Sequence, residues 1–190
     1  MFIVIDVEST CGIGVDRDKS EIIEIGYVLV SVPGQKLHVN YTFVRPVLNP
    51  ILTDFCKDLT HISQNDVDNA VKYPDAITKM SNDVYSVSGS SMSNCVMCSW
   101  GDYDREMFIQ CGKQHGLSDE FPFFGHVNLK REWALANGLK VKGMGLKKAL
   151  EYSGMSFEGS PHRGVDDALN IANLMGRQWP GKFTGMMKLL

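Results

Sequence analysis

The sequence opens with Met1-Phe-Ile-Val-Ile-Asp-Val-Glu-Ser-Thr10, an apolar run that ends in two carboxylates. Residues 2–5 are β-branched or aromatic, which predicts a strand buried on both faces in the middle of a sheet. Asp6 and Glu8 are two positions apart, so their side chains leave the same face of that strand, about 7 Å apart along the chain. Two like charges there are costly unless a cation lies between them, which points to half of a divalent-metal site. The alternative is a surface Asp and Glu that begin an ordinary loop.

Length and composition predict one α/β domain over residues 1–190. The chain has 44% apolar and 22% charged residues, and no apolar run approaches the ~20 residues that a membrane span needs. Because Met1 leads almost directly into the first strand, we expect no secretory leader, no membrane partner and a cytoplasmic location. The net charge of −3 gives no global attraction to nucleic acid. A nucleic-acid enzyme remains compatible with that charge, since bound cations would supply the attraction locally.

The five cysteines predict reduced thiols rather than a disulfide framework, because their number is odd and they are scattered. Cys95 and Cys98 have the spacing of half a zinc site. They lie in an apolar strand, however, and no second ligand pair follows, so we expect no zinc there.

The order of the predicted elements defines the fold class. Three strands, at residues 2–5, 21–30 and 36–47, precede any long helix and predict an antiparallel meander. Helices are predicted around 52–59, where Leu52, Phe55 and Leu59 recur, and at 66–73, 74–87, 103–116, 128–137, 145–153 and 165–179. Two further strands are predicted at 95–100 and 122–125. This pattern predicts an α/β fold with a mixed five-stranded sheet flanked by helices, close to the ribonuclease H-like arrangement.

A third acidic ligand is expected after the strand at 95–100, because α/β sheets place ligands at the carboxyl ends of their strands. Asp102 and Asp104 are both candidates. Asp104 is preferred, since Met107 and Phe108 lie three and four residues later and anchor it by the buried face of a helix. Its alternative role is a helix N-cap, which Asp fills readily.

The stretch Ser160-Pro-His-Arg-Gly-Val-Asp-Asp-Ala168 supplies the remaining candidates. Ala168 begins an apolar helical stripe, so Asp167 is expected at the buried edge of the helix while Asp166 points elsewhere. His162 lies five residues before Asp167, in a lead-in where a loop can hold it over the same site. The other histidines, His38, His61, His115 and His126, are interpreted as incidental.

Taken together, Asp6-x-Glu8, Asp104, and His162 followed by Asp167 resemble the DEDDh family of 3′–5′ exonucleases in order, spacing and context. The segments Trp100-Gly-Asp-Tyr-Asp-Arg105, Asn128-Leu-Lys130 and His162-Arg-Gly-Val-Asp-Asp-Ala168 are most similar to its KapD and enhancer-of-RNAi branch. The resemblance spans nearly the whole chain. It implies a DnaQ-like exonuclease domain that releases nucleoside 5′-monophosphates from the 3′ end of single-stranded RNA or of 3′ overhangs.

The resemblance also implies two divalent cations, Mg²⁺ or Mn²⁺, held by four carboxylates: Asp6, Glu8, Asp104 and Asp167. Hard oxygen ligands suit these ions. Two cations roughly 4 Å apart can neutralise both the attacking and the leaving oxygen of a phosphodiester displacement. His162, with an ordinary pKa of about 6.5, is expected to take the proton from the attacking water as a general base.

Substrate contacts are expected from main-chain groups of Val7, Ser9 and Thr10, which the resemblance assigns to the 3′-terminal sugar. Trp100 is expected either to stack a base or to pack in the core. The expected partner is the 3′ end of a single-stranded nucleic acid, with RNA favoured and DNA possible, and the protein is expected to be a monomer or homodimer. Two alternatives stay open: a proofreading-type DNA exonuclease, and a regulatory binding protein that keeps the fold.

Overall fold

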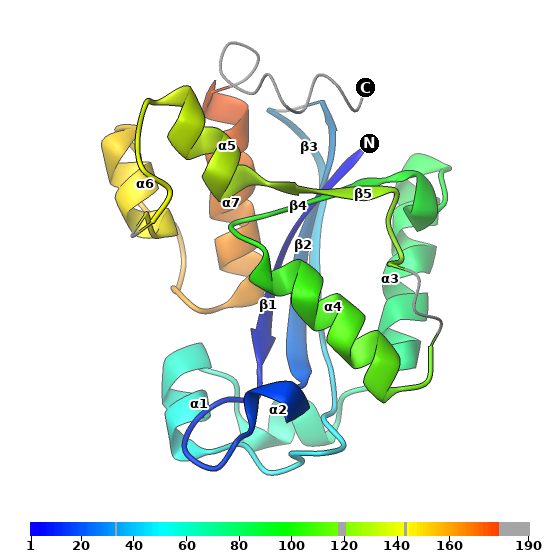
Figure 1. Cartoon of the computed structure of the whole chain (residues 1–190). Helices are drawn as coiled ribbons and strands as arrows, with labels where there is room; N and C mark the ends of the chain where they lie inside the picture. The colour runs from blue at the N-terminus through cyan, green and yellow to red at the C-terminus, as the bar shows by residue number, and fades with distance from the viewer. Residues whose placement is uncertain (33, 118–120, 143, 179–190) are drawn as a thin grey trace.

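The computed structural model describes residues 1–32, 34–117, 121–142 and 144–178. Over these residues it contains one mixed sheet with five strands in the order β3-β2-β1-β4-β5 (Figure 1). The strands are β1 (Phe2–Ser9), β2 (Ile22–Val32), β3 (Gln35–Phe43), β4 (Val96–Ser99) and β5 (Gly125–Asn128). The first three form the predicted antiparallel meander, and β4 and β5 continue the sheet parallel to β1. The predicted fold class is confirmed.

Seven α-helices surround the sheet in the described part of the chain. They are α1 (Asp54–Thr60), α2 (Gln64–Asp68), α3 (Tyr73–Ser88), α4 (Tyr103–Gln114), α5 (Leu129–Ala136), α6 (Leu146–Tyr152) and α7 (Gly164–Gln178). Figure 1 shows α5, α6 and α7 on one side of the sheet and α3 and α4 on the other. The short helices α1 and α2 lie beyond the carboxyl end of β1.

Strand β1 is buried on both faces, as its sequence predicts. Phe2 and Val4 pack against residues of α5 and α7, whereas Ile3, Ile5 and Val7 pack against residues of α3 and α4. Because side chains alternate along a strand, the even-numbered carboxylates at the end of β1 continue the face that α7 covers. The hydrophobic pattern of β1 thus decides on which side of the sheet a site is built.

The helix expected at 66–73 lies at Gln64–Asp68, and two further local expectations are wrong. The fifth strand lies at Gly125–Asn128 and not at 122–125. Phe123 packs its ring on Phe108, 5.4 Å away between centroids, and pairing with β4 begins where Gly125 meets Val96. The bounds of β5 are therefore set by its register with β4 rather than by the local run of apolar residues.

The second correction concerns the helix predicted around 52–59. Phe55 is 58% exposed, while Cys56 and Thr60 on α1 are buried. The helix begins at Asp54, after the N-cap Thr53, and this start turns Phe55 outward. The last residue of the predicted helix at 165–179 lies outside the described residues.

The described residues include no helix that is long and apolar enough to cross a membrane. All five cysteines are free thiols, and four of them are buried. The extent of the domain over residues 1–190 stays a prediction, as does the oligomeric state.

Candidate active site

An acidic cluster lies where β1 ends against the first turn of α7. Asp6, Glu8 and Asp167 each offer a carboxylate oxygen, and these oxygens all lie within 4.8 Å of one another. All three side chains are half-buried. Residues from opposite ends of the chain thus come together as the sequence analysis expected. Their role as metal ligands stays a prediction.

Asp104 is fixed beside this cluster rather than at the protein surface. It is buried in the first turn of α4, and its Oδ1 accepts a hydrogen bond from the backbone N–H of Val7 at 2.9 Å. Val7 lies between Asp6 and Glu8 in the sequence, so this hydrogen bond holds Asp104 on α4 next to the two carboxylates of β1. Asp102 is instead 62% exposed in its side chain and accepts a hydrogen bond from Asn128 Nδ2 at 2.9 Å. The contacts favour Asp104 over Asp102.

The electrostatics of the cluster favour protonation or a bound cation. Burial, reinforced by repulsion from neighbouring carboxylates, raises the pKa of Glu8 to about 9 and the pKa of Asp6 well above its ordinary value. Burial likewise raises the pKa of Asp167 to about 7, and that of Asp104 to about 6 against the opposing hydrogen bond from Val7. Acidic groups of this kind are stabilised in their charged form by a divalent cation. The donor set consists of hard oxygens, which fits Mg²⁺ or Mn²⁺.

The turn before α7 holds His162 in a left-handed backbone conformation, with φ of 63°. This conformation is uncommon for a residue with a side chain and marks a constrained position. The backbone N–H of His162 donates to Asp167 Oδ2 at 2.8 Å, and that of Ser160 donates to Asp166 Oδ2 at 2.9 Å. The two aspartates are therefore used differently, as predicted. The His162 residue is exposed.

A buried ion pair that the sequence analysis missed anchors this turn. Arg163 donates from Nε and Nη2 to the two carboxylate oxygens of Glu24, each at 3.2 Å, and Glu24 is fully buried on β2. The Gly164 backbone N–H donates to Glu24 Oε2 at 3.1 Å. The guanidinium also lies over the rings of Tyr41 and Phe43, 5.7 and 5.4 Å from their centroids. A glutamate in the middle of an apolar strand was the sequence signal for this pair.

A second missed contact supports Asp104. The Ser99 hydroxyl donates to the Gly101 carbonyl at 2.9 Å and lies 2.8 Å from His126 Nε2. The nearby Ser99 hydroxyl lowers the pKa of Asp104, although burial has the larger, opposite effect. Burial lowers the pKa of His126 to about 4, so the ring is neutral at pH 7. His126 is thus part of the support of the site rather than incidental.

The expected substrate residues have mixed surroundings. The N–H groups of Val7 and Thr10 are already used, by Asp104 and by the Glu21 carbonyl at 2.8 Å. Trp100 packs its ring against Trp133, 6.0 Å away between centroids, and donates from Nε1 to the Met144 carbonyl at 3.2 Å. These contacts favour the core alternative for Trp100.

A different aromatic ring lies at the site. Tyr103 precedes Asp104, is 42% exposed, and places its hydroxyl 2.6 Å from the Ser9 hydroxyl. Together with Thr10 and Cys11 it lines a cavity of about 260 Å³. Tyr103 was not among the residues predicted from the sequence, although it directly precedes a candidate ligand.

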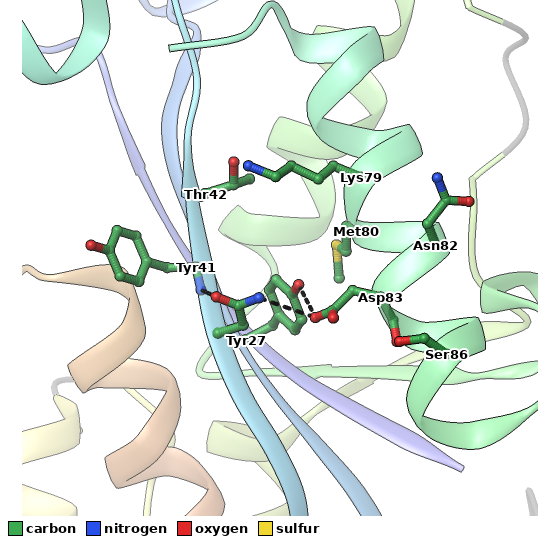
Figure 2. Close-up of a pocket in the computed structure, with 9 residues that line it drawn as sticks. Tyr27, Tyr41, Thr42, Lys79, Met80, Asn82, Asp83 and Ser86 are labelled. Atoms are coloured by element: carbon green, nitrogen blue, oxygen red, sulfur yellow. Dashed lines mark hydrogen bonds between the residues drawn. The ribbon is translucent and has the colours of Figure 1, made fainter. Parts of the chain in front are cut away.

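A separate hollow lies between β3 and α3, on the other side of the sheet (Figure 2). It has a volume of about 330 Å³. Asp83 on its wall accepts hydrogen bonds from the Tyr27 hydroxyl at 2.6 Å and from Asn40 Nδ2 at 3.2 Å. This carboxylate joins α3 to the sheet and belongs to no acidic cluster among the described residues.

Comparisons with known proteins agree with this geometry. The RNase_T exonuclease family matches residues 3–175. ERI1 exoribonuclease 2 of Homo sapiens is 31% identical over 191 residues, which cover 90% of this chain and 27% of that protein. The 3′-5′ exoribonuclease 1 of Mus musculus is 32% identical over 183 residues, which cover 92% of this chain and 51% of that protein. The chain therefore spans about a quarter to a half of the length of these curated relatives.

Solved structures give the same result. The nuclease domain of 3′hExo, described as a DEDDh family member bound to rAMP, matches with a TM-score of 0.86 and 26% identity. The match covers 96% of this chain and 94% of that one. A 3′-exonuclease solved for its recognition of the histone mRNA stem-loop matches with a TM-score of 0.84 and 27% identity, over 93% of this chain and 62% of that one.

Proposed function

Because this chain belongs to the RNase_T family of exonucleases, we propose that it is a metal-dependent 3′–5′ exonuclease. It would release nucleoside 5′-monophosphates from the 3′ end of single-stranded RNA or of 3′ overhangs. The observation that carries the proposal is the meeting of Asp6, Glu8 and Asp167 within 4.8 Å. The resemblance of the sequence to DEDDh exonucleases is supported by the same family match.

The residues divide the chemistry between them. Asp6, Glu8, Asp104 and Asp167 would hold two divalent cations, Mg²⁺ or Mn²⁺, and these ions, when bound, would neutralise charge on the phosphoryl oxygens. His162 would accept the proton of the attacking water, because its side chain is exposed, its backbone bonds Asp167, and histidine is the most common general base in enzymes. Its backbone N–H, bonded to Asp167, holds the backbone of His162 next to the cluster.

The terminal nucleotide would lie over the end of β1. Main-chain groups of Val7, Ser9 and Thr10 stay the proposed contacts for the terminal sugar, although the carbonyls of Ser9 and Thr10 already accept from Cys56 Sγ and from the Ser20 hydroxyl. Tyr103 is the better candidate for stacking a base, and Trp100 is the second, because its indole is engaged with Met144. RNA is the proposed substrate because two of the matched relatives are named exoribonucleases. We also keep the cytoplasmic location as a prediction.

The test is a digestion assay with 5′-labelled single-stranded RNA, single-stranded DNA and blunt duplexes, each with Mg²⁺, Mn²⁺ or chelator. We expect a ladder that shortens from the 3′ end on single-stranded RNA and is lost with chelator. Faster digestion of the matched DNA would favour the DNA exonuclease. Binding without turnover, unchanged in Asp6→Ala, would favour the regulatory binding protein.

Substitution of the proposed general base is expected to separate chemistry from metal binding. In His162→Asn the left-handed backbone is retained, because Asn tolerates positive φ, and the imidazole is lost. We expect kcat to fall roughly 10²-fold or more, while the rise of Tm on adding Mg²⁺ is unchanged. His61→Asn is the matched control, since His61 is the other histidine with positive φ, 57°, among the described residues. Equal activities of the two variants would contradict the assignment.

The choice between the two aspartates of the β4–α4 turn can be tested directly. Asp104→Asn is expected to lower activity about 10²-fold or more, because one ligand charge is removed from a buried position. Asp102→Asn is expected to keep activity within about 2-fold, because the Asp102 side chain is mostly exposed and makes no cap hydrogen bond. Asn also keeps an oxygen that can accept from Asn128 Nδ2. The measurement is the initial rate of each variant on the same RNA. If Asp102→Asn is inactive and Asp104→Asn is active, Asp102 is the ligand and the assignment is reversed.

A further inference from the structure

The segment that joins α5 to α6 carries a cluster of positive charge. Residues 139–148 contain four lysines and no acidic residue, on a chain whose net charge is −3. We call this group the lysine strip: Lys140, Lys142, Lys147 and Lys148. All four are exposed, and none of them takes part in an ion pair with another described residue.

The strip is held on the same side of the sheet as the acidic cluster. Leu139, Val141 and Leu146 pack on the core that α7 forms with β1, whereas the four lysines next to them in the sequence are exposed. The indole N–H of Trp100 donates to the Met144 carbonyl and ties the segment to the β4–α4 turn that carries Asp104. Figure 1 shows α6 beside α7.

Charge distinguishes this surface from the hollows along β3. The hollow drawn in Figure 2 has the Asp83 carboxylate on its wall. The neighbouring hollow, of about 520 Å³, is lined by Asp66 and by Lys79. A polyanion gains little there, because a carboxylate faces it in each hollow. The lysine strip presents four positive charges and no negative one in ten residues, which is the pattern that phosphate backbones bind.

We propose that the lysine strip binds the phosphate backbone of the substrate strand on the 5′ side of the nucleotides in the active site. This inference rests on the proposed function and adds a substrate requirement to it. Substrates long enough to reach α6 are bound more tightly, in a salt-dependent and sequence-independent way, whereas the shortest oligonucleotides do not engage the strip. Turnover of the terminal nucleotide itself is independent of these lysines.

The test compares two quadruple variants with equal loss of charge. The first is Lys140→Gln/Lys142→Gln/Lys147→Gln/Lys148→Gln. The control is Lys19→Gln/Lys72→Gln/Lys79→Gln/Lys113→Gln, whose lysines are exposed elsewhere on the protein. Each variant and the unmodified chain are titrated onto a fluorescent single-stranded RNA of about 12 nucleotides, with chelator to prevent turnover, over a series of salt concentrations. Steady-state rates are measured with Mg²⁺ on the same RNA and on a trinucleotide.

For the strip variant we expect affinity for the long RNA to fall on the order of 10-fold, and the slope of log K against log salt to decrease by up to about 3. Its KM on the long RNA rises, while kcat and the rate on the trinucleotide stay unchanged. The inference would be overturned if the strip variant had the same RNA affinity and the same salt dependence of binding as the control variant. An inactive unmodified chain would instead overturn the proposed function, and the titration with chelator would still report on the strip.

Discussion

The metal-free protein is expected to lose stability as pH rises from about 4 to about 9, and Mg²⁺ is expected to restore it. Burial raises the pKa of Glu8 to about 9, that of Asp167 to about 7 and that of Asp104 to about 6. Between the unfolded and the folded pKa of each group, the folded state binds more protons than the unfolded state. The free energy of unfolding therefore falls as pH rises through that window.

The size of this effect follows from the shifts. Each unit of pKa difference corresponds to about 1.4 kcal/mol, so the cluster as a whole should account for several kcal/mol between these limits. Divalent cations bind the ionised carboxylates, and a ligand that binds only the folded state adds stability by mass action. The increase of Tm on adding Mg²⁺ should consequently be small near pH 5 and large near pH 8.

The measurement is a set of thermal melts from pH 5 to pH 9, in chelator and in Mg²⁺. Other groups titrate over the same range, so the informative quantity is the difference in stability from Glu8→Gln. This variant removes a carboxyl group whose pKa is raised to about 9 and keeps the size of the side chain. In chelator this variant should be more stable than the unmodified chain at high pH. A metal-free stability that is flat or rising with pH, and equal in Glu8→Gln, would contradict the electrostatic account of the cluster.

Parts of the site were predictable because they depend on local pattern. The run at residues 2–5 indicated a buried strand, and alternation along it put Asp6 and Glu8 on one face. The apolar stripe that begins at Ala168 did the same for Asp167. In each case the side-chain direction follows from the residue's own element, and the convergence of the two elements at one edge of the sheet follows from the fold class.

The supports of the site were not predictable in this way. The Arg163–Glu24 pair joins residues 139 positions apart, and the Ser99–His126 contact depends on the register of β5, which local apolarity placed three residues too early. Trp100 illustrates the same limit, since its partner Met144 comes from a distant loop. Such contacts depend on how the helices and strands pack against one another, and this packing cannot be read from the local pattern of a single sequence.

The second prediction with a large expected effect concerns a close backbone contact that no sequence motif indicates. Gly26 on β2 lies against the start of α7, so closely that an added Cβ would fall on backbone atoms of Gly164 and Val165. A Cβ on Gly164 would in turn lie 2.9 Å from the Asp6 carbonyl oxygen. These two glycines let the helix approach the sheet until Asp167 reaches Asp6 and Glu8. The geometry of the acidic cluster therefore depends on the absence of a side chain at Gly26 on the neighbouring strand.

Gly26→Ala is accordingly expected to lower the free energy of unfolding by about 3 kcal/mol or more, since backbone atoms cannot move aside as a flexible side chain can. It should also reduce the Mg²⁺-induced rise of Tm, because displacement of α7 carries Asp167 and His162 away from β1. Gly112→Ala is the matched control, because Gly112 is buried in α4 and an added Cβ meets nothing within 4 Å. Ala stabilises a helix interior by roughly 0.5–1 kcal/mol relative to Gly, so this variant should not lose stability. Urea unfolding of both variants, with and without Mg²⁺, makes the comparison. If Gly26→Ala unfolds like Gly112→Ala and responds equally to Mg²⁺, then the approach of α7 to the sheet does not set the geometry of the acidic cluster.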